Sequence, residues 1–229
     1  MVIVIDPQIA GISGDMLLSS LIDLGADKNE IINSIKKTEK FLSGSTIKKI
    51  DFQKTKKHGI ESTELILEID ENISKRKGIE IKKAILDSVN ELNLSIKAKT
   101  FAESCINTLI SSESKIHGIN EDSVHFHEAS SIDTLIDIVG VTIACENLKL
   151  FEEKIVCLPV SVGGGTVSFS HGTMSNPASA VLQIFKNSNL NIQGNNSKEE
   201  LTTPTGACIL TNLTNNSIEY YPSMNITSI

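Results

Sequence analysis

Residues 124–140 read Val-His-Phe-His-Glu-Ala-Ser-Ser-Ile-Asp-Thr-Leu-Ile-Asp-Ile-Val-Gly, and the rest of the chain is organised around them. His125 and His127 are two positions apart, so on an extended segment both imidazole rings point to the same face. Asp133 and Asp137 are four positions apart, so on a helix their carboxylates share a face. With Glu128, these residues supply the ligands that divalent transition metals accept at neutral pH. The stretch therefore predicts a metal site where an extended segment meets a helix.

Two plainer interpretations of this stretch compete with a metal site. A His-x-His pair on a strand can be two ordinary edge residues, and an acidic pair on a helix can face solvent. The expected helix at 132–150 argues against the solvent-facing alternative, because apolar residues cover nearly all of its sides. A helix of that kind is buried, and a buried carboxylate needs a partner. We therefore favour the metal site.

Composition narrows the class of protein. The chain has 229 residues, 40% of them apolar, which is enough for one sizeable domain or two small ones. A formal net charge of −7 and the lack of a Lys/Arg-rich stripe argue against nucleic-acid binding. We see no apolar run that would span a membrane and no signal peptide. Four cysteines without a CxxC pair are typical of a reduced, cytoplasmic protein.

Hydrophobic spacing predicts an alternation of strands and helices. A short β-branched run at 2–5 and a longer run at 154–162 indicate buried strands, and the chain is expected to close with a strand at 220–226. Segments 46–54 and 61–69 indicate an antiparallel hairpin. Residues 187–198 are expected to form a loop. Helical spacing and end signals predict helices at 15–24, 28–37, 79–93, 97–114, 132–150, 178–186 and 207–212.

A glycine loop lies between the first strand and the first helix. Gly11, Ser13 and Gly14 present backbone N–H groups just before a helix start, which is a place that accepts an anion. The loop matches neither a Walker A sequence nor GxGxxG, so alone it is a weak signal. In the plainer alternative, Ser13 caps the helix and Asp15 complements the helix dipole.

Two further loops carry candidate ligand-binding residues. Thr203, Thr205 and Gly206 open the last helix, where hydroxyl groups and free N–H groups again suit an anion. His171 stands beside a glycine and follows the flexible turn at 163–165, which makes it a candidate for the site. His117 ends a helix, and there we favour a simple interaction with the helix dipole.

The motifs have a similar place in the expected fold, because each lies in a loop that connects a strand to the following helix. In open α/β sheets, loops of this kind build the ligand crevice at the carboxyl ends of the strands. We therefore expect an α/β fold, with mixed α+β left open, in which helices pack on a β-sheet and ligand loops lie at strand-to-helix junctions.

Five motifs in this order resemble the LarC family, the nickel insertion proteins of nickel-pincer nucleotide cofactor biosynthesis. The resemblance runs from Asp6 to about Ala207. It rests on Gly-Ile-Ser-Gly-Asp-Met at 11–16, Val-His-Phe-His-Glu at 124–128, Asp133 with Asp-Ile-Val-Gly at 137–140, His-Gly at 171–172 with Pro-Ala at 177–178, and Leu-Thr-Thr-Pro-Thr-Gly-Ala at 201–207.

The resemblance implies a nickel chelatase or cyclometallase of the lyase class. Its substrate would be pyridinium-3,5-bisthiocarboxylic acid mononucleotide, and its product would contain a nickel–carbon bond. Family members consume CTP with Mg²⁺ or Mn²⁺, and full-length members bind CTP in a further C-terminal domain. Residues 1–229 would then be a single N-terminal domain that does not complete the reaction by itself.

The residues and the resemblance together suggest roles for the site. His125, His127 and Glu128 would hold or hand over Ni²⁺, with Asp133 or Asp137 as ligands or as partners that orient the imidazoles. The two anion loops would hold the nucleotide phosphate, and Asp15 would bind Mg²⁺ or steer nickel. Forming a nickel–carbon bond releases a ring proton, and either His171 or Glu128 would accept it.

Two other functions remain open. A metal-dependent phosphohydrolase would also use His, Asp and phosphate-binding loops. A non-catalytic module that holds substrate or docks the missing CTP domain would bind metal weakly. Apolar surface expected near residues 220–229 would also favour a homo-oligomer.

Overall fold

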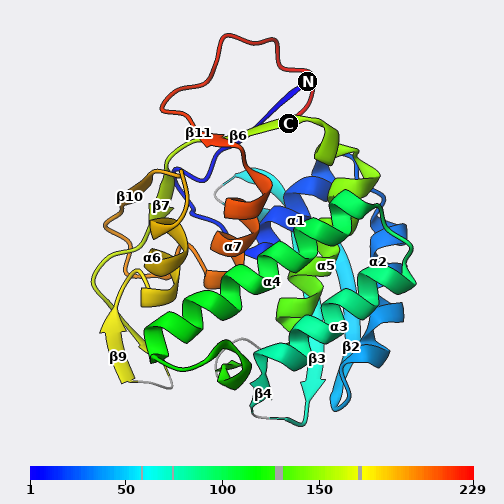
Figure 1. Ribbon diagram of the computed structural model, residues 1–229. Coiled ribbons are helices and arrows are strands. Elements are labelled where there is room, and N and C mark those ends of the chain that lie inside the picture. The colour runs from blue at the N-terminus through cyan, green and yellow to red at the C-terminus, as the bar shows by residue number, and fades with distance from the viewer. Residues whose placement is uncertain (58, 74, 127–130, 170–171) are drawn as a thin grey trace.

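The computed structural model describes residues 1–57, 59–73, 75–126, 131–169 and 172–229 (Figure 1). Helices make up its centre. They are α1 (Gly14–Asp23), α2 (Lys28–Thr38), α3 (Gly78–Glu91), α4 (Ile96–His117), α5 (Ser131–Asn147), α6 (Ser179–Lys186) and α7 (Pro204–Leu213). Short 3-10 helices follow α2, α4 and α5 at Glu39–Phe41, Glu121–Ser123 and Leu150–Glu152. The helices expected from hydrophobic spacing are confirmed, with ends shifted by a few residues.

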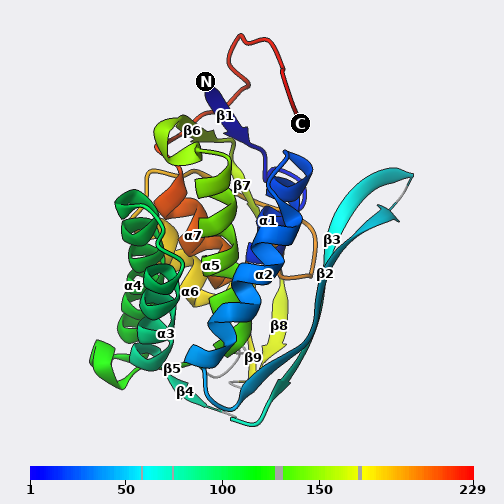
Figure 2. The ribbon, with the colours of Figure 1, turned by 90° about the vertical axis from the view of Figure 1, so that its right-hand side faces the viewer.

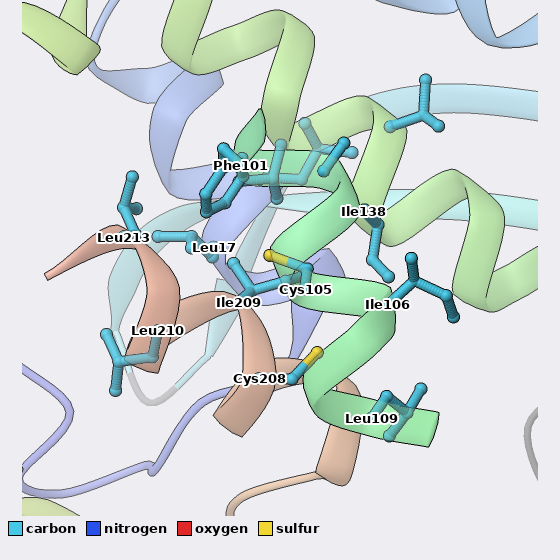
Figure 3. Close-up of a cluster of buried hydrophobic side chains, with 14 of the residues drawn as sticks. Leu17, Phe101, Cys105, Ile106, Leu109, Ile138, Cys208, Ile209, Leu210 and Leu213 are labelled. Carbon is cyan, nitrogen blue, oxygen red and sulfur yellow. The ribbon is translucent and has the colours of Figure 1, made fainter. Parts of the chain in front are cut away.

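Helix α5 is the centre of the hydrophobic core, as its all-round apolar sequence predicted. It packs against α1, α2, α3, α4 and α7. Figure 2 shows α3 and α4 on one side of α5 and a long hairpin on the other, with α1 next to the hairpin. Figure 3 shows side chains of α1, α4, α5 and α7 meeting at one point of this core: Leu17, Phe101, Cys105, Ile106, Ile138, Cys208 and Ile209.

The strands form several small sheets instead of one broad sheet. Strands β1 (Val2–Ile5), β6 (Lys154–Cys157) and β11 (Asn216–Ser217) are parallel in the order β1-β6-β11, and β7 (Val160–Val162) pairs in parallel with β10 (Ile192–Gly194). Three antiparallel pairs complete the set, formed by β2 (Ser45–Lys57) with β3 (Ile60–Glu71), β4 (Arg76–Lys77) with β5 (His125–Phe126), and β8 (Thr166–Phe169) with β9 (Gly172–Ser175). The mixed α/β class is confirmed.

Three details of the strand prediction are wrong. The expected strand 154–162 is two strands with different partners, because it is interrupted at Leu158 and Pro159, and proline has no N–H to donate to a ladder. Part of the expected loop 187–198 is strand β10. The expected strand 220–226 does not form, and the chain lies exposed there, with Tyr220 80% exposed and Ile229 96% exposed.

The hairpin β2–β3 follows one side of the molecule, and its tip leaves the body (Figure 2). Its register runs from the Ser45–Glu71 pair to the Lys57–Ile60 pair. Leu65 and Leu67 of β3 pack against the core while the tip residue Ile60 is exposed. The body end of this ribbon therefore forms a wall against α1. Within the described residues, no helix combines the length and the apolar character needed to cross a membrane.

Helix α4 has well-defined ends. The Ser95 hydroxyl oxygen accepts a hydrogen bond from the N–H of Ala98 at 3.2 Å, which caps the start. Gly118 ends the helix with φ 63°, a left-handed conformation that glycine adopts without strain. The last turn of α4 thereby stops beside the 3-10 helix Glu121–Ser123.

Candidate functional site

A cavity of about 780 Å³ lies between the helices and the body end of β3, which is large enough for a mononucleotide. Helices α1, α4, α5, α6 and α7 all contribute to its wall. The described residues that line it are Ser13, Asp15, Leu65, Leu67, Leu109, Glu113, Ile116, His117, His125, Phe126, Asp133, Asp137, Ala178, Ser179, Ala180, Glu200, Thr203, Pro204 and Thr205.

The two predicted anion loops, at 11–14 and 203–206, lie side by side at this cavity. The N–H of Ile12 donates to the carbonyl of Leu201 at 2.9 Å, and the N–H of Thr203 donates back to the carbonyl of Ile12 at 3.1 Å. Glycines permit this approach: a Cβ at Gly11 would lie 2.2 Å from the Leu201 oxygen, and one at Gly206 would lie 2.3 Å from the Ile12 oxygen. These glycines therefore bring the starts of α1 and α7 together and do not line the cavity themselves.

The hydroxyl groups at the two helix starts behave differently. Thr203 caps α7, because its hydroxyl oxygen accepts a hydrogen bond from the N–H of Gly206 at 3.0 Å. The Ser13 side chain makes no capping bond to α1 and instead donates to the carboxylate of Asp15. The plainer alternative, in which Ser13 caps α1, is therefore wrong. Ser13, Thr203 and Thr205 all line the cavity.

Three aspartates from α1 and α5 line the same cavity. Asp137 is 6% exposed, and its Oδ1 atom is buried without a hydrogen-bond partner among the described residues. Gly14 makes room for this carboxylate, because a Cβ at Gly14 would lie 2.3 Å from Asp137 Oδ2. The glycine loop thus places Asp15 of α1 over Asp133 and Asp137 of α5.

Burial and mutual repulsion make this acidic group hard to ionise. Burial, followed by the charges of Asp15 and Glu71, raises the pKa of Asp133 to about 6. Burial and the neighbouring Asp133 and Asp15 raise the pKa of Asp137 well above its usual range. No lysine or arginine among the described residues lines the cavity to offset these charges. A bound cation would favour the ionised carboxylates.

His125 also faces the cavity from β5. Its Nδ1 atom lies 2.8 Å from the carbonyl oxygen of Ser123. Because a carbonyl oxygen can only accept, Nδ1 is the donor in this contact, and Nε2 is the ring nitrogen left for a ligand. Metal-ligating imidazoles commonly have their other ring nitrogen held by a carbonyl in this way.

The metal centre expected from the sequence is only partly within the described chain. Asp15, His125, Asp133 and Asp137 line one cavity. His127, Glu128 and His171 lie outside the described residues. Within the described part of the chain, no three His, Cys, Asp or Glu side chains surround a common point at metal-binding distance.

Two parts of the site differ from the expectation. Glu113 and His117 of α4 line the cavity, although His117 was expected only to meet the helix dipole. Their spacing of one helical turn was the available signal. In contrast, the glycine turn at 163–165 does not line the cavity: a Cβ at Gly163 would lie 2.1 Å from Asn176 Nδ2 and from the Glu199 oxygen. This turn also leads to the β8–β9 hairpin and not to a helix.

Comparison with known proteins gives a family match and several named relatives. Residues 3–229 match the family described as nickel insertion protein. A relative from Methanothermobacter thermautotrophicus named for nickel insertion is 32% identical over 99% of this chain and 53% of its own length. One from Methanosphaera stadtmanae, named likewise, is 36% identical over 97% of this chain and 54% of its own length.

A third relative carries a more specific name. It is the pyridinium-3,5-bisthiocarboxylic acid mononucleotide nickel insertion protein of Staphylococcus epidermidis, which is 36% identical over 96% of this chain and 52% of its own length. The chain thus spans about half the length of the curated relatives it matches. No solved structure matches it. The match over nearly the whole chain shows that it belongs to the nickel insertion protein family.

Proposed function

We propose that this chain holds nickel and an anionic mononucleotide together so that nickel is inserted into pyridinium-3,5-bisthiocarboxylic acid mononucleotide. The family match and the name of the Staphylococcus epidermidis relative support this substrate. Nickel is the cargo of the reaction and not a resident cofactor.

The observation that carries the proposal is the charge of the cavity. Among the described residues, buried Asp137 has an oxygen without a hydrogen-bond partner, and burial together with neighbouring carboxylates raises the pKa values of both Asp133 and Asp137. The starts of α1 and α7 lie at the same cavity, and helix starts favour anionic groups. A divalent cation would satisfy the carboxylates and remove their repulsion of the phosphate and thiocarboxylate groups. We therefore propose that the cation binds before the nucleotide.

The residue roles follow from this arrangement. Asp15, Asp133 and Asp137 hold or steer the cation, and His125 offers Nε2 as a nickel ligand. Ser13, Thr203 and Thr205 contact the nucleotide phosphate at the helix starts, with Gly11, Gly14 and Gly206 keeping the two loops close. We further propose that His127 and Glu128 bind the nickel and that either His171 or Glu128 accepts the ring proton.

The proposal extends to the remainder of the reaction. The chain acts with a C-terminal domain that binds CTP and Mg²⁺ or Mn²⁺, and residues 1–229 form the single nickel-handling domain. The reaction belongs to the lyase class and takes place in the cytoplasm, where the four free, buried cysteines stay reduced.

A reconstitution tests the proposal. The purified chain is mixed with Ni²⁺ and the bisthiocarboxylate mononucleotide, with or without CTP, Mg²⁺ and the C-terminal half of a longer relative, and the nickel–carbon product is followed by mass spectrometry. We expect nickel and nucleotide binding by the chain alone and product only in the complete mixture. If neither ligand binds the chain, the proposal fails.

Two further measurements distinguish nickel insertion from the two other functions, a phosphohydrolase and a docking module. Hydrolysis of p-nitrophenyl phosphate by the chain with Mn²⁺ would favour a phosphohydrolase. Tight association with the C-terminal half, without nickel binding, would indicate a docking module.

A further inference from the structure

Glu113 and His117 face the cavity from the last two turns of α4. They are one helical turn apart, with His117 Nε2 3.4 Å from Glu113 Oε2. The Glu113 side chain is 19% exposed and that of His117 is 34% exposed, so both are partly shielded yet reachable from the cavity. The family resemblance gave neither residue a role.

The spacing of these two atoms fits a shared metal ion. Nitrogen and oxygen ligands bind transition metals at roughly 2.0–2.2 Å, which places two neighbouring ligand atoms roughly 2.9–3.4 Å apart. Ligand pairs four residues apart on one helix face are a known way to hold such an ion. The pair therefore needs little rearrangement to accept a metal.

The Glu113–His117 pair and the aspartates differ in the metal ions that their ligand atoms prefer. An imidazole with one carboxylate suits nickel, whereas carboxylates alone suit Mg²⁺ and Mn²⁺. The three aspartates lie on α1 and α5, while Glu113 and His117 lie on α4. The cavity thus presents ligands of two different chemistries from different helices.

We propose that Glu113 and His117 form a second, two-ligand nickel position on α4, distinct from His125 of β5 and from the aspartates on α1 and α5. The identity of the cargo rests on the proposed function. With two protein ligands, the ion keeps its other coordination positions for water. The sulfur donors of the incoming nucleotide displace this water without any change in the oxidation state of nickel. Such a position holds nickel yet releases it to a stronger ligand.

A comparison of two metals tests this position. Calorimetric titrations with NiCl₂ and with MnCl₂ are run on the chain, on His117→Gln, on Glu113→Gln and on the control Glu103→Gln. Glu103 is a carboxylate of the same helix that pairs with Lys82 at 3.5 Å and does not line the cavity. We expect each cavity substitution to weaken one nickel-binding step at least about tenfold, while the nickel bound through His125 remains. The manganese affinity of every variant should equal that of the wild type, and so should the nickel affinity of Glu103→Gln.

A second measurement needs no variant. Octahedral Ni²⁺ with nitrogen, oxygen and water ligands is paramagnetic, so substoichiometric Ni²⁺ should broaden the imidazole signals of His117 in an NMR spectrum of the histidine-labelled chain. Unchanged His117 signals, or unchanged nickel affinity in a folded His117→Gln variant, would mean that the pair is only an ion pair at the end of α4. If the wild-type chain binds no nickel at all, the proposed function fails as well, whereas nickel binding that ignores both substitutions overturns this position alone.

Discussion

Replacing Asp133 by asparagine should remove part of the pH dependence of the folding stability. In the folded chain, burial and the charges of Asp15 and Glu71 raise the pKa of Asp133 from an ordinary 3.8 to about 6. The folded protein therefore holds this proton to a higher pH than the unfolded chain does. Its stabilising effect is fully present below about pH 4 and is lost as the pH rises through about 6.

The size of the effect follows from the same two values. A pKa difference of about two corresponds to about 3 kcal/mol of folding free energy that the wild type loses between about pH 4 and about pH 7.5. The asparagine side chain does not ionise, so Asp133→Asn should gain up to about 3 kcal/mol relative to the wild type over this range. The pKa of Asp137 is also raised in the folded chain, so the wild type should lose further stability when this carboxyl ionises at higher pH.

Urea unfolding with EDTA present measures this difference. Both proteins are unfolded at about pH 4.5, 6 and 7.5, and their free energies of unfolding are subtracted at each pH so that common contributions cancel. The gap in favour of Asp133→Asn should widen with pH. A constant gap, or a variant that becomes relatively less stable at the highest pH, would refute the assignment of a buried, repelled carboxylate.

Three substitutions around the cavity test its packing by thermal unfolding. Gly206→Ala should lose at least about 2 kcal/mol because its Cβ would lie 2.3 Å from the Ile12 oxygen, while Gly194→Ala, which meets nothing within 4 Å, serves as control. Thr203→Val removes the cap of α7 and should cost about 1 kcal/mol; an unchanged midpoint would contradict the capping bond. Thr134→Val should gain about 1 kcal/mol, because the Thr134 hydroxyl is buried without a partner among the described residues, and a loss would show that it has one.

Local patterns predicted the helices and the central stretch well. The all-round apolar surface of α5 required burial, and of its two aspartates Asp137 is buried and Asp133 is half-buried, both at the cavity. The glycine loop and the threonine loop were expected to share a ligand site, and they lie at one cavity. The pairing of Ile12 with Leu201 and Thr203 that joins them is long-range, so no local pattern signals it directly.

The failures have different origins. Pro159 has no N–H to donate, which indicates a break in the strand, yet the continuous apolar run around it favoured one strand. The β-like residues at 220–226 find no neighbouring strand among the described residues, since β11 occupies the edge of β6 with Asn216 and Ser217. The place of His117 at the cavity was missed because a histidine at a helix end is common, and only the fold shows that α4 ends at the cavity.

The measurement that tests the central claim most directly is X-ray absorption at the nickel edge of the nickel-loaded chain. If nickel is held in this cavity, the spectrum should show nitrogen and oxygen neighbours with the outer-shell pattern of at least one imidazole. Sulfur neighbours from the buried cysteines would contradict the account, because they would place nickel in the core and away from the cavity that the helix starts and aspartates build.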